Sequence, residues 1–178
     1  MQPNHAAPEV DKISAKTDSL PVPDEPVKVI LADDDKEDQE LFQEALSETN
    51  IPSELTTFDN GKELMDNLKD PTESNPDIIF IDINMPVKNG REVLAEIKAD
   101  EDLKDIPTIM LSTSKNEKEV EESFQAGANL YVPKPHSFDN FIILLKKIFS
   151  LTWTGELLRP LRKTFFLSEN NLQENDRC

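Results

Sequence analysis

Ile78-Ile79-Phe80-Ile81-Asp82 is the stretch that decides the fold, because four apolar residues run without interruption and end on an acid. Such runs are typical of strands in a parallel sheet, where helices cover both faces. Two similar runs occupy residues 27–32 and 108–111, and shorter candidates lie at 55–58 and 130–132. The sequence therefore predicts five strands.

An amphipathic stretch follows each strand candidate. The apolar faces of these stretches are, in chain order, Leu41, Phe42, Ala45 and Leu46; Leu64, Met65 and Leu68; Val93, Leu94 and Ile97; Val120 and Phe124; and Phe138, Phe141, Ile142, Leu145, Ile148 and Phe149. We expect Gly61 to open the second helix and Gly127 to close the fourth. The alternation predicts an α/β fold of the (βα)₅ type, a doubly wound parallel sheet with right-handed crossovers.

Composition excludes several classes of function. The 178 residues include 36 Asp and Glu against 19 Lys and Arg, a net charge of −17, which opposes a nucleic-acid partner. No apolar run is long enough to span a membrane, and the first residues lack a secretory pattern, so we expect a cytoplasmic protein. A single cysteine, Cys178, and two distant histidines, His5 and His136, exclude an internal disulfide and a thiolate or imidazole metal cage. A bound metal would therefore have oxygen ligands.

Three segments differ in composition. Residues 1–26 hold five of the 13 prolines and are expected to form a flexible acidic leader. Residues 27–150 hold the periodic pattern of one domain. Residues 151–178 are too few for a separate output domain, yet they include Trp153 and the apolar run 165–167. We expect a homodimer through the region of the fifth helix rather than an extension packed on its own chain.

Polar side chains follow four of the five strand candidates. Asp33-Asp34-Asp35 follows the first, Asp82 ends the third with Asn84 just beyond, Ser112 follows the fourth and Lys134 the fifth. In open parallel sheets, ligands bind at the carboxyl ends of the strands. Converging carboxylates repel one another unless a cation neutralises them, and Mg²⁺ prefers carboxylate, carbonyl and water oxygens.

A phosphoryl group would complete both the metal shell and the pairing of Lys134. A carboxylate can be the nucleophile that accepts it, which gives an aspartyl phosphate. The metal and Lys134 would neutralise the transferring oxygens, and Ser112 would donate a hydrogen bond to one of them.

These residues resemble the receiver domain of two-component response regulators. The stretches that carry the resemblance are 29–35, 76–86 with Gly90, 106–112 and 127–135. The resemblance covers residues 27–150 and implies a flavodoxin-like sheet with strand order 2-1-3-4-5. The extension is similar to those of some stand-alone receivers, including partners of bacterial phytochromes.

The resemblance implies that Asp82 accepts a phosphoryl group from a histidine kinase or phosphotransfer protein. It implies a Mg²⁺ site made by Asp33, Asp34, Asp82 and the backbone carbonyl of Asn84. A protein of this kind is not an enzyme in the ordinary sense, because it catalyses only its own phosphorylation and dephosphorylation.

The resemblance also assigns roles around the phosphoryl group. Ser112 and Lys134 would contact it, and the Lys134–Pro135 peptide would be cis. Ser112 and Tyr131 would form a switch in which Tyr131 turns inward when Ser112 moves. The changed surface would then be read by a downstream protein, which the sequence does not identify.

Other interpretations fit parts of the pattern. The acids at 33–35 could be only a helix cap and first turn, a role that suits Asp35. A haloacid dehalogenase-like phosphatase also uses an Asp nucleophile, but it needs a second acid where Asn84 stands. A flavodoxin-like electron carrier would not place three acids beside a flavin phosphate. A docking module that works without phosphate is the remaining alternative.

Overall fold

Five parallel strands form one sheet in the order β2-β1-β3-β4-β5 in the computed structural model, which describes residues 25–153 and 161–171. The strands are β1 (Val27–Ala32), β2 (Ser53–Phe58), β3 (Ile78–Asp82), β4 (Thr108–Ser112) and β5 (Leu130–Pro133). The expected fold class and strand order are confirmed. Each observed strand contains its predicted run, and the differences are confined to the ends.

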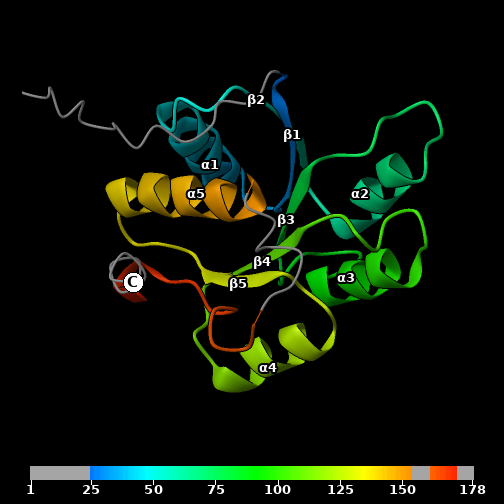
Figure 1. The fold of residues 1–178 in the computed structure, drawn as a ribbon. Coiled ribbons are helices and arrows are strands. Elements are labelled where there is room, and N and C mark those ends of the chain that lie inside the picture. The colour runs from blue at the N-terminus through cyan, green and yellow to red at the C-terminus, as the bar shows by residue number, and fades with distance from the viewer. Residues whose placement is uncertain (1–24, 154–160, 172–178) are drawn as a thin grey trace, which may run out of the picture.

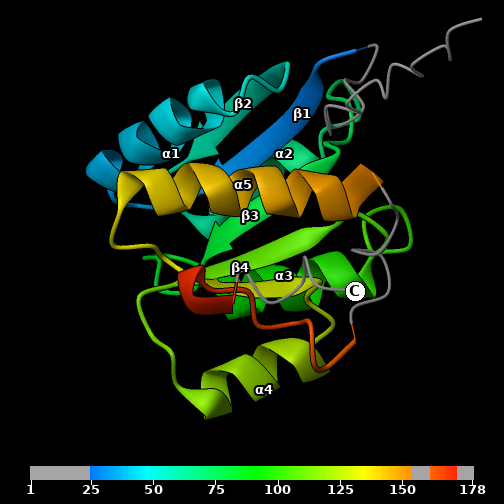
Figure 2. The ribbon, with the colours of Figure 1, turned by 60° about the vertical axis from the view of Figure 1, so that its left-hand side comes forward.

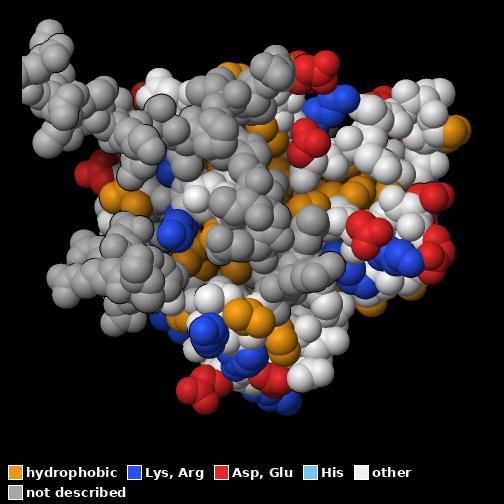
Figure 3. Space-filling view, viewed as in Figure 1, with side chains coloured by type: hydrophobic (Ala, Val, Ile, Leu, Met, Phe, Trp, Pro, Cys, Tyr) orange, Lys and Arg blue, Asp and Glu red, His pale blue; other side chains and the backbone are white. Residues whose placement is uncertain are grey.

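Among the described residues, five α-helices cover the two faces of the sheet. They are α1 (Lys36–Glu48), α2 (Gly61–Leu68), α3 (Gly90–Ala99), α4 (Glu117–Gln125) and α5 (Phe138–Trp153). Figures 1 and 2 show α1 and α5 on one face and α2, α3 and α4 on the other. In Figure 3, basic and acidic side chains alternate over the α2–α3 side, which carries ion pairs such as Lys62–Asp66 and Lys88–Glu96.

Alternation along β3 explains why both faces are apolar. Ile78 and Phe80 belong to the core beneath α1 and α5, whereas Ile79 and Ile81 belong to the core beneath the other three helices. All four side chains are fully buried. A continuous apolar run is therefore what a strand with two covered faces requires.

Caps fix where four of the helices begin. The side chains of Asp35, Asn60, Asn89 and Asn116 each accept a hydrogen bond from a backbone N–H in the first turn of α1, α2, α3 and α4. Gly127 follows α4 with a φ of 88°, the left-handed conformation expected where a helix ends on glycine. The cap residue Asp35 donates its N–H to Asp33, and Asn89 precedes Gly90, which packs on the Asp82 carbonyl, so these two caps also fix the loops of the site.

Two members of the predicted apolar faces are exposed. Leu41 of α1 and Phe138 of α5 each expose 37% of their surface, although their neighbours Phe42 and Phe141 are buried. Leu41 lies one position before the buried Phe42, and Phe138 lies one turn before the buried Phe141. Among the described residues, no helix is long and apolar enough to span a membrane.

Part of the C-terminal extension packs on its own chain, which corrects our preference against a self-packed tail, while a homodimer through the region of the fifth helix stays a prediction. The Tyr131 N–H donates to the Phe165 carbonyl at 2.9 Å, and the Leu167 N–H donates to the Tyr131 carbonyl at 3.0 Å. Phe165 and Leu167 are buried, and Figure 2 shows this segment beside β5 and above α4. The reason is that β5 has a free edge, which the extension pairs with. The leader up to residue 24, residues 154–160 and Cys178 lie outside the described residues.

Candidate functional site

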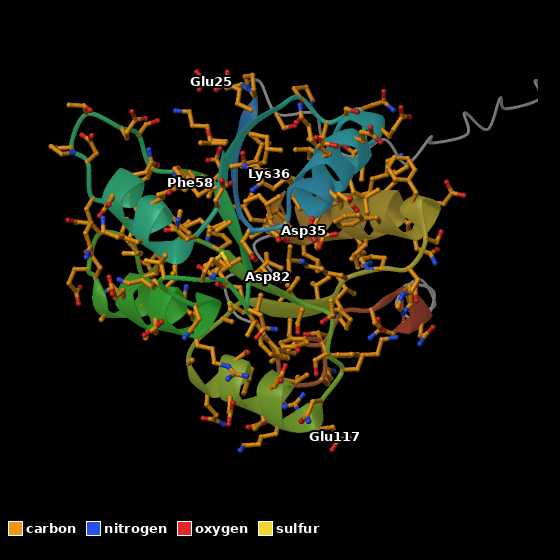
Figure 4. All side chains as sticks on the ribbon, turned by 180° about the vertical axis from the view of Figure 1, so that it is seen from behind. Glu25, Asp35, Lys36, Phe58, Asp82 and Glu117 are labelled. Atoms are coloured by element: carbon orange, nitrogen blue, oxygen red, sulfur yellow. The ribbon has the colours of Figure 1, made fainter. Side chains whose placement is uncertain are left out.

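Three acids converge where β1 and β3 end. Asp33 and Asp34 follow β1, and Asp82 is the last residue of β3, which pairs directly with β1. One carboxylate oxygen from each lies within 4.8 Å of the others. Figure 4 labels Asp82 together with Asp35, which continues the chain beyond β1. Asp33 and Asp82 are buried and Asp34 is exposed, so the cluster opens to solvent on one side.

Lys134 brings the only ammonium that the described residues place on this cluster. Its Nζ lies 2.7 Å from Asp33 Oδ2, 3.0 Å from Asp82 Oδ1 and 2.6 Å from an oxygen of Asp38, a residue of α1. The Lys134 N–H donates to the Ser112 carbonyl at 2.7 Å, which ties the lysine to the end of β4. Asp82, Ser112 and Lys134, the three residues expected to surround a phosphoryl group, therefore lie at the ends of the neighbouring strands β3, β4 and β5.

The charges of the cluster shift the pKa values of its members. Burial raises the pKa of Asp33 above its ordinary value, and the bonds to Lys134 only partly oppose this. Burial by itself would lower the pKa of Lys134, but its hydrogen bonds to Asp33 and Asp38 and the charge of Asp82 raise it overall. Lys134 therefore stays charged, while the acids around it outnumber it. An excess of carboxylate charge is what a divalent cation neutralises.

Ser112 is the last residue of β4, and Tyr131 is the second residue of β5, the strand that pairs with β4. Ser112 is fully buried, and its Oγ accepts a hydrogen bond from the Ser114 N–H at 3.0 Å. Tyr131 is already buried rather than at the rim. Its hydroxyl donates to the Ser114 carbonyl at 3.0 Å and lies 3.2 Å from a Glu119 carboxylate oxygen. One short segment, the loop after β4, thus contacts both expected switch residues.

The loop after β3 contacts both the side chain and the backbone of Asp82. The Asn84 N–H donates to Asp82 Oδ2 at 2.8 Å, and the Asn84 side chain is exposed. Gly90 packs so closely that a Cβ there would lie 2.3 Å from the Asp82 carbonyl oxygen. The expected cis peptide before Pro135 is wrong, since the described residues contain no cis peptide bond. The trans form is intrinsically favoured even before proline.

Sequence reasoning missed two residues of the site. Asp38 binds Lys134 directly, and the buried Gln39 donates to the Asp33 carbonyl at 2.5 Å and to Asp59 at 2.9 Å. A signal was available for Asp38, because it precedes the buried Phe42 by four residues and so shares its face of α1. Gln39 carried no comparable signal.

Comparisons with known proteins agree with this geometry. Residues 29–146 match the family model for the response regulator receiver domain. The chain is 37% identical over 139 residues to the response regulator Rcp1 of Synechocystis sp., an alignment that covers 76% of this chain and 94% of Rcp1.

Two solved structures show the same similarity. The phosphorylated cyanobacterial phytochrome response regulator RcpA matches with a TM-score of 0.67 and 38% identity, over 73% of this chain and 96% of RcpA. The Mn²⁺-bound form of Rcp1 matches with a TM-score of 0.64 and 36% identity, over 70% of this chain and 93% of that structure. With the strand order and the acidic cluster already described, these matches show that the chain belongs to the response regulator receiver domain family and takes part in phosphorelay signalling.

Proposed function

We propose that Asp82 is the phosphoacceptor, and that it receives a phosphoryl group from a histidine kinase or phosphotransfer protein in a Mg²⁺-dependent reaction in the cytoplasm. The observation that carries the proposal is the position of Asp82. Its side chain is 8% exposed, one oxygen faces Lys134 at 3.0 Å, and the cluster with Asp33 and Asp34 lies beside it. The phosphorylated state of the relative RcpA and the Mn²⁺-bound form of Rcp1 support the same chemistry.

The residues of the cluster fit a divalent cation, because three carboxylates offer oxygen ligands within 4.8 Å of one another. Asp33, Asp34 and Asp82 would hold Mg²⁺ together with the backbone carbonyl of Asn84. When bound, the cation supplies positive charge next to the transferring oxygens.

In the transfer, a carboxylate oxygen of Asp82 forms a bond to phosphorus. The bond from phosphorus to the donor breaks, and its electron pair leaves with the donor, so a phosphohistidine donor becomes a neutral imidazole after gaining a proton. Lys134 binds one phosphoryl oxygen, and Ser112 donates a hydrogen bond to another. Attack by water on the same phosphorus returns Asp82 and releases phosphate.

The signal would leave the site through the loop after β4. The phosphoryl group adds negative charge and acceptor oxygens at Asp82, which draws Ser112 toward it. Ser114 bonds both Ser112 and Tyr131, so a movement of this loop changes the support of the Tyr131 ring. The surface around α4, β5 and α5 would then change its affinity for a downstream protein or a second copy of the chain.

Exposure to a small acyl phosphate with Mg²⁺, followed by intact mass, tests the proposal. We expect a gain of one phosphoryl group that is lost in Asp82→Asn and on chelation of Mg²⁺. Asp77→Asn is the matched control, because Asp77 precedes the same strand at its opposite end and accepts the Lys28 N–H. A gain that persists in Asp82→Asn would place the acceptor elsewhere.

A further inference from the structure

The three carboxylates that bind Lys134 are not equivalent. Asp33 and Asp82 are nearly buried, with side chains 3% and 8% exposed, and both are drawn into the proposed reaction. Asp38 lies at the rim, with a side chain 38% exposed, and comes from α1 rather than from a strand end. It is the partner of Lys134 that is neither a proposed metal ligand nor the phosphoacceptor.

The reaction takes acceptors away from Lys134. An ammonium has three donors, and in the structure they face Asp33, Asp38 and Asp82. A cation would engage the oxygens of Asp33 and Asp82, and the phosphoryl group would occupy an oxygen of Asp82. The bond to Asp38, at 2.6 Å, remains available throughout.

Lys134 also has space into which it could turn. A cavity of about 40 Å³ lies beside it and is lined by Asp38, Leu41, Phe42 and Phe141 among others. A lysine side chain is long and flexible, whereas Asp38 has a short side chain on a helix. That helix is fixed by the cap at Asp35 and by the edge-to-face contact of Phe42 with Phe141 of α5. Asp38 can thus restrain the ammonium from a rigid support.

We propose that Asp38 is a positioning residue that holds the Lys134 ammonium over Asp82 while Asp33 and Asp82 engage the cation and the phosphoryl group. This inference rests on the proposed function. Asp38 also brings a negative charge near an anionic donor, which would slow the transfer. That repulsion acts through solvent at the rim and is screened, whereas the contact with Lys134 is direct and charge-assisted.

The test measures the rate of phosphorylation by a small acyl phosphate at saturating Mg²⁺, and the Kd for Mg²⁺ by calorimetry. Loss of one charge-assisted bond in Asp38→Ala should lower the maximal rate roughly tenfold. Asp38→Asn, which keeps an acceptor oxygen, should fall between wild type and alanine. Glu37→Ala is the matched control, because Glu37 is exposed in the same first turn and is not a partner of Lys134. We expect the Kd for Mg²⁺ to stay within twofold in all of these variants, on the order of measurement error.

A double-mutant cycle separates positioning from a structural role. If Asp38 acts through Lys134, Asp38→Ala should have no further effect in a Lys134→Ala background. An equal or faster rate in Asp38→Ala, or the same loss in the Lys134→Ala background, would overturn the inference while wild type still gains its phosphoryl group. A wild-type protein that gains none would overturn the proposed function, and this inference with it.

Discussion

Tyr131 is the one tyrosine of the chain, so its ionisation can be followed by itself. Burial raises the pKa of its hydroxyl above 10, and the carboxylate of Glu119 raises it further, against hydrogen bonds with Ser112 and Ser114. Since the folded protein holds this proton more tightly than the unfolded chain, its contribution to stability is complete below about pH 10 and is lost as the pH rises further.

The expected result is a tyrosinate absorbance at 295 nm whose midpoint lies higher in the folded protein than in denaturant. Tyr131→Phe provides the control, because it keeps the ring and its stacking with Phe166 but removes the signal. Equal midpoints in the two states would mean that the hydroxyl is open to solvent in the folded protein.

Some residues of the site were predictable from sequence and others were not. Asp33, Asp34, Asp82 and Lys134 could be brought together because parallel strands place their carboxyl ends at one edge of the sheet. The spacing from Phe42 places Asp38 on the inward face of α1, but its contact with Lys134 could not be assigned, since that contact depends on the rotation of α1 against the sheet.

Contacts between loops could not be predicted from the sequence either. The ammonium of Lys98 donates to the carbonyls of Lys104 and Ile106 and to the side chain of Asn129. These acceptors lie in two different loops, whose conformations no periodic pattern specifies.

At the scale of the element, the start of α3 is bound to the end of β3. The Gly90 N–H donates to the Ile83 carbonyl at 3.0 Å, and Asn89 with Glu92 forms a capping box around it. A Cβ at position 90 would meet the Asp82 carbonyl oxygen at 2.3 Å and the Ile83 Cα at 2.9 Å. These are backbone atoms, so they can yield only if Asp82, the proposed phosphoacceptor, moves with them.

Gly90→Ala should therefore destabilise the protein by about 1–3 kcal/mol and also slow the phosphorylation of Asp82. Urea unfolding and the rate with a small acyl phosphate measure the two effects. Gly127→Ala is the matched control. Its φ of 88° makes alanine strained there, but the nearest atoms to its Cβ belong to Lys98, away from the site. We expect it to lose stability and to keep the wild-type rate. Normal phosphorylation in Gly90→Ala would show that the loop adjusts without moving Asp82.

At the scale of the whole molecule, the C-terminal extension packs against α4, β5 and α5. Phe165 packs edge-to-face on Phe124 of α4, and Phe166 stacks on Tyr131 of β5. Arg162 bonds Glu121, and Glu169 accepts from Asn140 of α5. The extension thus joins α4, β5 and α5, the surface through which we propose that the signal leaves.

The sequence showed that the extension was apolar but not what it packs against. An apolar run such as Phe165-Phe166-Leu167 is equally suited to its own domain and to a second copy, because hydrophobic burial is non-directional. In the structure the extension pairs with the free edge of β5 of its own chain, through the two backbone hydrogen bonds to Tyr131. That edge could be inferred from the strand order, but the sequence did not set the register of the pairing.

Truncation of Phe165 is the sharpest test of this packing. The side chain is fully buried between α4 and β5, so Phe165→Ala should lower the free energy of unfolding by roughly 3–5 kcal/mol. Leu161→Ala, in the same segment but 58% exposed, should change it by less than about 0.5 kcal/mol. Urea unfolding at several protein concentrations makes the comparison. If the extension packs on its own chain, the midpoint of Phe165→Ala falls at every concentration, and ending the chain after Trp153 lowers it at least as far. A loss of stability that appears only at high concentration, together with a smaller species in sedimentation, would instead mean that the extension binds a second copy.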